Sequence, residues 1–357
     1  MTAYRLSGIA GIALMGMAAS AGAQEQQLNL FNWSDYMDPA LIEDFERETG
    51  IEVVENYYNS NAELFSKLTA GGDSQYDVIV PSDYFMPRLI QAGLVQPLVG
   101  EGEHLEGREA ILDEFRQPAY DPDGRYTVPY LWGTTGIVYN REIWPDPEHS
   151  WSLLYDPEVN PDQPFALLKG DAQFTFGTAC AYLGEGFDCV GEAPWVKAAQ
   201  LVIETRQRDN FVGFIDATAT IEQLARGVIQ AGIAYNGDLA SKQAESPETY
   251  GKIGFFIPEE GAQRWVDVMA IPARAPHPEA AQAFIRYMLR PDVAARLANY
   301  NYYTTPNQAA LEQVEDVLRK PPVMPDAKAR EALMATPSVE GQQLQLLQQL
   351  WSEARSR

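Results

Sequence analysis

Four short segments of this 357-residue chain combine aromatic side chains with a carboxylate, a combination suited to an organic cation. They are residues 32–36 (Asn-Trp-Ser-Asp-Tyr), 81–85 (Pro-Ser-Asp-Tyr-Phe), 236–238 (Asn-Gly-Asp) and 265–267 (Trp-Val-Asp), and Tyr302 and Tyr303 add two further rings. Ring faces attract an ammonium group by cation–π contacts worth about 0.5–2 kcal/mol each, and a buried carboxylate accepts a charge-assisted hydrogen bond from it. None of the four segments contains Lys or Arg, so they favour amines over anions and amino acids as ligands.

Each of these residues also has an ordinary structural role available to it. Trp33 and Trp265 could be core aromatics, and Asp35 and Asp238 could cap helices. Ser82 could belong to a turn. The position of all four segments at predicted strand ends or edges favours a shared site, because open parallel sheets bind ligands beyond the carboxyl ends of their strands.

From residue 28 onward, the sequence predicts the strands and helices that position these segments. Asp38 is a typical N-cap and is followed by a proline, Gly50 ends that helix, and Ser60 or Asn61 caps the next one. The helices separate three predicted strands at residues 28–31, 51–54 and 77–80. A β-α-β-α-β order predicts a parallel sheet with right-handed crossovers.

The rest of the chain predicts a second α/β unit and a return to the first. Residues 124–139 are extended, apolar and interrupted by glycines, as expected of a strand that leaves one lobe and enters the next. Further strands are predicted at 228–235, 253–257 and 266–271, helices at 195–205, 278–289 and 292–298, and a helical tail from Asn307. We expect the strand at 253–257 to carry the chain back. The predicted lobes are residues 28–131 plus 256–306, and 132–255 plus 307–357.

The first 23 residues predict export from the cytoplasm. Arg5 precedes an apolar stretch over residues 6–19, and small residues end at Ala23, which is the pattern of a signal peptide cleaved after that alanine. The alternative is a membrane anchor, but the apolar stretch is shorter than the roughly 20 residues that a span needs. No later segment is apolar enough to cross a membrane, so no membrane insertion is expected of the mature chain.

Cys180 and Cys189 both lie in the exported part of the chain. An even number of cysteines in an oxidising compartment predicts one disulfide between them. The alternative is a pair of buried, unpaired thiols. Neither interpretation provides a catalytic thiol, since no histidine lies nearby in the sequence.

The net charge and the histidine content of the chain disfavour several classes of partner and of site. The chain has 26 Lys and Arg against 50 Asp and Glu, a formal net charge of −24. A surface this acidic repels phosphate backbones and anionic lipids, which disfavours nucleic acid and membrane surfaces as partners. The three histidines lie far apart, so neither a His-rich metal centre nor a His-based triad is expected.

Enzymatic alternatives have little support. The sequence lacks the G-x-S-x-G, phosphate-loop and H-E-x-x-H motifs. Asp238 and Asp267 could serve as the two opposed carboxyls of a glycosidase, so an exported carboxylate-dependent hydrolase stays an alternative. The export signal and two-lobe layout favour a non-catalytic binding protein.

Five motifs in the order of the chain resemble the periplasmic spermidine/putrescine-binding proteins of ABC importers. They are residues 32–36, 76–82 (Tyr-Asp-Val-Ile-Val-Pro-Ser), 129–136 (Pro-Tyr-Leu-Trp-Gly-Thr-Thr-Gly), 236–238 and 265–267. The resemblance implies an α/β, two-lobed type II periplasmic binding protein fold, with each lobe a mainly parallel sheet flanked by helices. It also implies a periplasmic, monomeric protein without cofactor that closes on an amine and delivers it to the permease subunits of an ABC transporter.

The resemblance also assigns ligand-binding residues in this chain. Tyr235 stands where the family often has Trp, Asp238 and Asp267 match amine-binding carboxylates, and Tyr303 matches a late aromatic wall. The complete set is Trp33, Ser34, Asp35, Tyr36, Ser82, Tyr84, Tyr235, Asp238, Trp265, Asp267 and Tyr303.

One departure from the family bears on the ligand. Where the family carries acidic residues before a helix, residues 169–174 read Lys-Gly-Asp-Ala-Gln-Phe. Asp171 substitutes for the missing acid if the loop shifts, or Gln173 replaces it. Otherwise the ligand carries one amine or a neutral far end, as a mono-amine, an agmatine-like molecule or a quaternary cation does.

Overall fold

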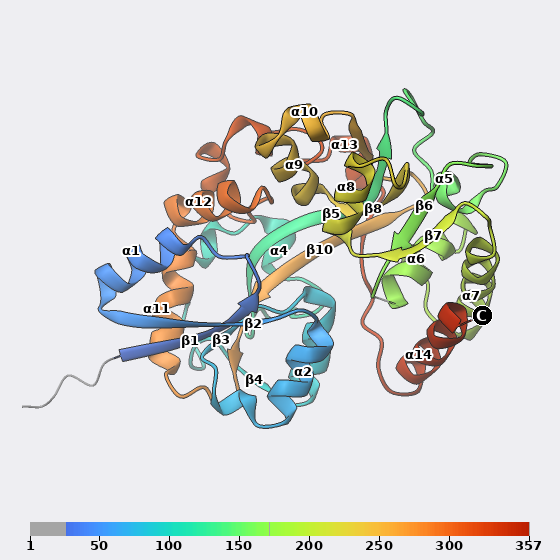
Figure 1. Cartoon of the computed structure of the whole chain (residues 1–357). Helices are drawn as coiled ribbons and strands as arrows, with labels where there is room; N and C mark the ends of the chain where they lie inside the picture. Colours follow the sequence, from blue (N-terminus) through green and yellow to red (C-terminus); the bar gives the residue numbers. More distant parts are fainter. Residues whose placement is uncertain (1–25, 171, 357) are drawn as a thin grey trace, which may run out of the picture.

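The computed structural model of the chain describes residues 26–170 and 172–356. The predicted signal peptide with its cleavage after Ala23, and the candidate contact Asp171, lie outside the described residues. The described part divides into two α/β lobes that lie side by side (Figure 1).

The first lobe is built on a parallel three-stranded sheet with strand order β2-β1-β3, which confirms the predicted β-α-β-α-β unit. Its elements are β1 (Gln26–Trp33), α1 (Pro39–Thr49), β2 (Ile51–Tyr58), α2 (Asn61–Thr69) and β3 (Val78–Ile79). The Asp38 side chain caps α1 by accepting a hydrogen bond from the amide of Ala40. Ser60 rather than Asn61 caps α2, with its Oγ 3.1 Å from the amide nitrogen of Glu63. The Asn61 side chain is thereby left for other contacts.

A single long strand, β5 (Val128–Asn140), passes from one lobe to the other and is buried along all 13 residues. Its first half pairs antiparallel with β10 (Ala262–Met269), and its second half pairs with β8 (Ala231–Tyr235) and β9 (Ile253–Phe256). The predicted crossing strand is therefore confirmed. The expectation that residues 253–257 return the chain to the first lobe is wrong, because β9 pairs with the second half of β5 and its residues Ile253 and Phe256 pack in the second core. The strand that returns is β10, which runs beside β5 in Figure 1.

The second lobe continues this sheet, whose order is β12-β10-β5-β8-β6-β7. Pairing among β8, β6 and β7 is parallel. The further elements of the second lobe are α5 (Ser152–Tyr155), β6 (Phe165–Leu168), α6 (Ala172–Tyr182), α7 (Glu192–Arg206), β7 (Phe211–Ile215), α8 (Ala217–Ala225), α9 (Asn236–Glu245) and α10 (Pro247–Tyr250).

Two hydrophobic clusters form the two cores. The first surrounds residues such as Phe31 and Phe284, and the second surrounds Trp151 and Trp195. Along β5 the membership changes between Trp132 and Ile137. Two cores on either side of a shared sheet account for a two-lobed α/β fold, while the residue-level lobe boundaries given above stay predictions.

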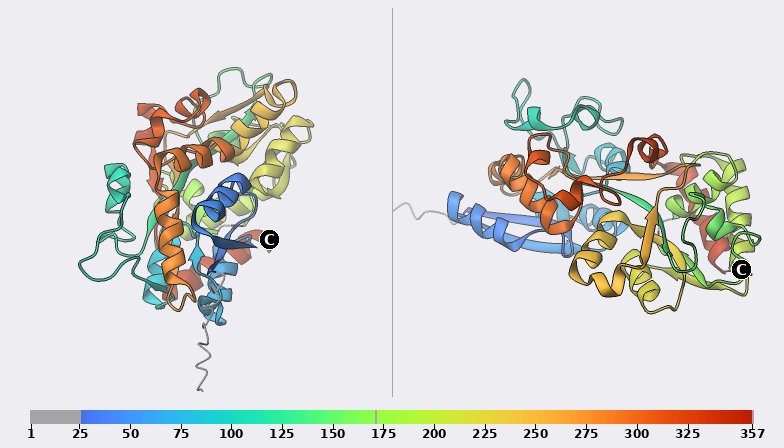
Figure 2. Two further views of the ribbon diagram at one scale, coloured as in Figure 1. Left: turned by 90° about the vertical axis from the view of Figure 1, so that its left-hand side faces the viewer. Right: turned by 90° about the horizontal axis from the view of Figure 1, so that it is seen from above.

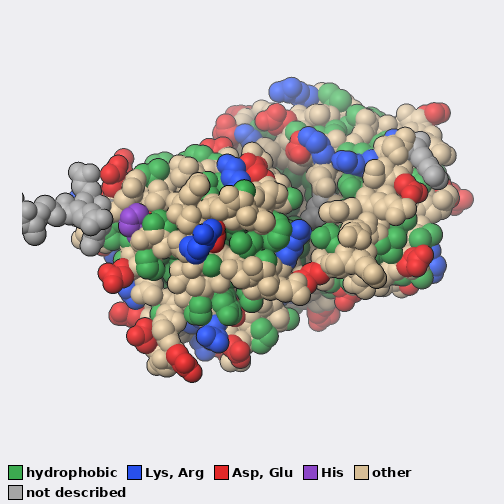
Figure 3. Space-filling view, turned by 90° about the horizontal axis from the view of Figure 1, so that it is seen from below, with side chains coloured by type: hydrophobic (Ala, Val, Ile, Leu, Met, Phe, Trp, Pro, Cys, Tyr) green, Lys and Arg blue, Asp and Glu red, His purple; other side chains and the backbone are tan. Residues whose placement is uncertain are grey.

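The remaining elements complete the first lobe and its surface. They are η1 (Gly72–Ser74), η2 (Asp83–Phe85), α3 (Met86–Gln91), β4 (Val95–Gln96), η3 (Arg108–Ala110), α4 (Asp113–Arg116), β11 (Ile271–Pro272), α11 (Pro278–Met288) and α12 (Pro291–Asn301). The segment that carries η3 and α4 projects from the body of the molecule, as the cyan loops in Figure 2 show. Acidic side chains occur on both lobes of the face in Figure 3, interspersed with Lys and Arg. None of the helices in the described residues is long and apolar enough to cross a membrane.

The tail is only partly helical, so the expectation of a helical segment from Asn307 onward needs correction. It contains η4 (Ala310–Glu312), η5 (Asp316–Arg319), α13 (Ala327–Glu331), β12 (Leu333–Ala335) and α14 (Gly341–Ser356). Pro321, Pro322 and Pro325 interrupt it, because proline lacks the amide hydrogen that a continuing helix requires. The last helix, α14, packs against α7 in the second lobe (Figure 1).

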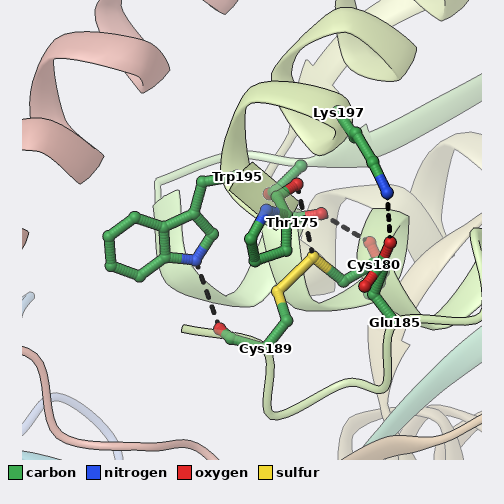
Figure 4. The surroundings of a disulfide bond; sticks show 8 residues. Thr175, Cys180, Glu185, Cys189, Trp195 and Lys197 are labelled. Atoms are coloured by element: carbon green, nitrogen blue, oxygen red, sulfur yellow. Dashed lines mark hydrogen bonds and ion pairs between the residues drawn. A yellow bond between two sulfur atoms is a disulfide. The ribbon is translucent and has the colours of Figure 1, made fainter. Parts of the chain in front are cut away.

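A disulfide joins Cys180, near the end of α6, to Cys189, which precedes α7. Figure 4 shows the surrounding contacts. The indole nitrogen of Trp195 donates a hydrogen bond of 3.2 Å to the carbonyl of Cys189, and Lys197 forms an ion pair with Glu185. The disulfide and these contacts together close the connection between the two helices.

Candidate ligand-binding cleft

One cavity of about 690 Å³ is lined by all eleven residues that the sequence singled out for ligand binding. They come from the ends of β1, β3 and β8, from the start of α9, from β10 and from the segment after α12. The shared position follows from the sheets, because the ends of their strands meet where the lobes face each other. The lining residues among the candidates are Trp33, Ser34, Asp35, Tyr36, Ser82, Tyr84, Tyr235, Asp238, Trp265, Asp267 and Tyr303.

Asp267 is the most deeply buried carboxylate of the cavity, with only 7% of its surface exposed. It lies on β10, where an isolated β-bridge brings Ser82 opposite to it. Its Oδ1 accepts a hydrogen bond of 2.7 Å from the Ser82 hydroxyl. Burial raises the pKa of Asp267 from 3.8 to about 7, although the hydroxyls of Ser82 and Tyr36 lower it in part. A cation beside Asp267 would relieve this desolvation cost.

Asp238 lies in the first turn of α9 and is held by two hydroxyl groups. Its Oδ1 accepts a hydrogen bond from the Tyr303 hydroxyl, and its Oδ2 accepts one of 2.8 Å from the Thr218 hydroxyl. Burial raises the pKa of Asp238, and these two bonds partly oppose the rise. The ring of Tyr303 fits here because residue 237 is glycine: a Cβ at Gly237 would lie 2.3 Å from the Tyr303 Cε1 atom.

Aromatic rings form the wall between these two carboxylates. The Trp265 ring centroid lies 4.9 Å from that of Tyr303 and 6.0 Å from that of Tyr235, with both pairs nearly perpendicular. Gly133 makes room for the indole, since a Cβ there would lie 2.4 Å from the Trp265 Cζ2 atom. Within the described residues the buried Nε1 of Trp265 has no hydrogen-bond partner, so it offers a donor at the cavity wall.

The strand ends of the first lobe supply another part of the cavity wall. Trp33 donates a hydrogen bond of 2.8 Å from Nε1 to the carbonyl of Val80, which fixes the orientation of its indole. Asn61 accepts a hydrogen bond from the amide of Ser82 and donates one of 3.3 Å to the hydroxyl of Tyr84. The Asn61 side chain therefore positions two of the candidate residues.

Ser34 and Asp35 are exposed at the rim, unlike the buried carboxylates within. Asp35 adopts a left-handed backbone conformation with φ of 54°, which is uncommon for a residue other than glycine. Asp35 thus lines the cavity from an exposed position.

Ten further lining residues were not among the sequence candidates. Most come from helices, whose orientation toward the cavity the sequence did not predict, whereas Leu168 is the last residue of β6 and Asn59 directly follows β2. Lys242 could have been predicted from the sequence, because it follows Asp238 by four residues on α9 and so lies on the same helix face. The ten are Asn59, Asn61, Leu168, Phe174, Thr218, Ser241, Lys242, Gln263, Tyr300 and Asn301.

The segment where the family carries acidic residues contributes apolar side chains to this cavity. Leu168 and Phe174 line it, whereas Gln173 is not among the lining residues and its amide donates to the carbonyl of Pro337. The described lining carboxylates are Asp35, Asp238 and Asp267. Among the residues that the structure describes, no group of three or more His, Cys, Asp or Glu has the arrangement of a metal site.

Comparison with known proteins agrees with this geometry. The family model for bacterial extracellular solute-binding proteins matches residues 40–326. The chain is 34% identical to the putrescine-binding periplasmic protein PotF of Escherichia coli, covering 92% of this chain and 91% of the relative. It is 32% identical to the spermidine/putrescine-binding periplasmic protein of Salmonella typhimurium, covering 89% of each. These matches confirm the resemblance inferred from the five motifs.

A solved structure extends the likeness to three dimensions. The spermidine/putrescine ABC transporter substrate-binding protein PotD of Streptococcus pneumoniae has a TM-score of 0.78 and 26% sequence identity, covering 93% of this chain and all of that one. The predicted fold class is therefore confirmed, and this chain belongs to the bacterial extracellular solute-binding protein family.

Proposed function

We propose that the protein binds a polyamine such as putrescine or spermidine in the periplasm and delivers it to the permease subunits of an ABC transporter. The observation that carries the proposal is one cavity with two largely desolvated carboxylates, Asp238 and Asp267, separated by aromatic rings. The protein acts as a monomer, without cofactor and without catalysis. Relatives named for putrescine, spermidine, agmatine and cadaverine binding support this class of ligand.

Each part of the cavity has a defined task in this proposal. Asp267 neutralises the first ammonium group, because its carboxylate is the most desolvated charge and gains most from a cation. Trp33, Trp265 and Tyr303 flank the methylene chain, and their ring faces add cation–π attraction near the charged ends. Asp238 lies on the α9 side of the same cavity and receives the polar or charged remainder of the ligand.

Closure of the lobes links binding to delivery. The candidate residues come from both lobes, so a ligand that contacts all of them has higher affinity for a closed arrangement. That differential affinity shifts the population toward the closed form, and the permease then recognises the surface that closure creates.

Calorimetric titration of ligand-free protein tests the proposal directly. The panel contains putrescine, spermidine, cadaverine, agmatine, butylamine and choline, with glutamate and maltose as non-amine ligands. We expect saturable binding of at least one polyamine and none of the non-amines. Binding of glutamate or maltose without any amine would overturn the proposal.

The same panel addresses the alternatives. Tighter binding of butylamine or choline than of putrescine would favour a mono-amine or quaternary cation, as the apolar contribution of Leu168 and Phe174 suggests. A hydrolase that uses Asp238 and Asp267 would release product from a glycoside or amide, which a turnover assay with chromatographic detection would reveal.

A further inference from the structure

A lysine lines the proposed amine cavity. Lys242 lies on α9, one turn after Asp238, and 26% of its side chain is exposed. Its Nζ lies 3.1 Å from Oε2 of Glu245, whose side chain is 67% exposed. Among the described lining residues Lys242 is the one with a permanent positive charge. A fixed positive charge in this position opposes the binding of a cationic ligand.

The carboxylates on the two sides of the cavity are not equivalent. Both oxygens of Asp238 already accept side-chain hydrogen bonds, and the charge of Lys242 adds to its stabilisation by lowering its pKa. The Asp267 carboxylate accepts a hydrogen bond from the Ser82 hydroxyl, and among the described residues no cation contributes to its pKa. A ligand ammonium therefore gains most at Asp267 and gains less at Asp238.

Glu245 only partly cancels the charge of Lys242. The side chain of Glu245 is mostly in solvent, where water screens the pair strongly, while the less exposed Lys242 lines the cavity. A second ammonium group of a ligand anchored at Asp267 would therefore be attracted less strongly on the α9 side than Asp238 alone would attract it. Repulsion between like charges at separations shorter than the Debye length persists at physiological salt.

We propose that Lys242 is a specificity-determining residue that lowers the affinity for each ammonium group a ligand carries beyond the one at Asp267. This inference rests on the proposed function and refines it: the preferred ligands are amines of low charge, and spermidine is disfavoured relative to putrescine. The cost is electrostatic, so the preference weakens as salt is added.

The test compares Lys242→Gln with the wild type by calorimetry, using butylamine, putrescine and spermidine as probes of one, two and three charges. We expect the variant to bind spermidine roughly fivefold or more tightly and putrescine to gain less, with butylamine changed by about twofold at most, as expected for like charges within a cavity. Glu245→Gln should shift the same three affinities in the opposite direction, with spermidine weakened most. The gains should shrink in 0.5 M NaCl.

Lys197→Gln is the matched control, because Lys197 also pairs with a glutamate but lies beside the disulfide, outside the cavity. It removes the same charge from the protein and should leave all three affinities unchanged. Equal gains for all three amines, or no gain in Lys242→Gln, would overturn the role of Lys242 while amine binding itself stands. Wild-type protein that binds none of the amines would overturn the proposed function and this inference with it.

Discussion

At the scale of single residues, burial of the Asp267 carboxylate lowers the stability of the ligand-free protein and increases its affinity for an amine. Its pKa of about 7 lies well above the 3.8 of an unburied carboxyl, because desolvation penalises the charged form. The carboxylate form is the one that attracts an ammonium group. The same burial that costs the free protein stability therefore gives an amine ligand more to compensate.

The first prediction is that amine affinity falls with decreasing pH. The ligand favours the ionised carboxylate and so lowers the pKa of Asp267 on binding. Affinity should be constant above about pH 8, decline through pH 7 and approach a tenfold loss per pH unit below it. Calorimetry at pH 6.5 in buffers of different ionisation enthalpy should detect released protons. An affinity for putrescine that is the same at pH 5.5 and pH 8 would contradict this assignment.

The second prediction concerns the Asp267→Asn variant, which should bind amines more weakly by at least about 2 kcal/mol. A folded pKa above the unfolded one means that stability is full below pH 3.8 and is lost as pH rises through 7. The neutral amide escapes this loss, so the ligand-free variant should be more stable than the wild type at pH 8 by on the order of 1 kcal/mol or more.

Urea unfolding at pH 8 and pH 5 measures the difference, which should be larger at pH 8. Asp35→Asn is the matched control for stability, since Asp35 is exposed and should show no comparable gain. A loss of stability in Asp267→Asn at pH 8 would show that hydrogen bonding to Ser82, and not desolvation, dominates at this residue.

How well single residues could be predicted depends on where they lie in the elements. The four segments that combine aromatic residues with a carboxylate could be predicted because strand ends and edges are visible in the sequence and converge by topology. The binding roles of Tyr235 and Tyr303 were predicted from the family resemblance. Phe174 and Thr218 could not be predicted, because the orientation of α6 and α8 toward the cavity depends on tertiary packing. Their roles in binding remain proposals, as do those of the eleven candidates.

At the scale of elements, local patterns predicted the N-terminal unit well and the crossings between lobes less well. Asp38 and Gly50 marked α1 because caps and left-handed glycines act locally. The choice between β9 and β10 as the returning strand depends on which half of β5 each one meets, and both are short apolar segments. Periodicity alone carries no information on long-range pairing.

The third prediction concerns the α6–α7 connection, which the disulfide closes over a sequence separation of nine. Replacing both cysteines by alanine should lower the free energy of unfolding by about 2–3 kcal/mol, mainly because the unfolded chain gains freedom. Phe174 lies near the other end of α6, so putrescine affinity should change by about twofold at most. Denaturant unfolding and calorimetry measure the two effects. A large loss of affinity at unchanged stability would mean that the disulfide positions the cavity wall.

At the scale of the whole molecule, the cavity depends on how the two lobes face each other. The partners of β5 change from β10 to β8 between Thr134 and Thr135. At this point the side chain of Asn236 accepts a hydrogen bond from the amide of Thr134 and donates one to the carbonyl of Val323. This buried amide thus joins β5, α9 and the tail segment where the lobes meet, and we expect rotation of the lobes to centre there.

The fourth prediction is that putrescine compacts the protein. A ligand that contacts both lobes stabilises the closed form. The radius of gyration measured by small-angle X-ray scattering should therefore decrease when ligand is added. At a free ligand concentration of 100 times Kd, unfolding should cost about 2.7 kcal/mol more by mass action. Asp267→Asn at the same putrescine concentration should be stabilised by only about 1 kcal/mol or less and should compact less, because it lacks the charge that anchors the ligand and binds it more weakly by at least about 2 kcal/mol. Tight binding by the wild type at a constant radius would mean that the cavity is already closed without ligand and that binding selects no new arrangement of the lobes.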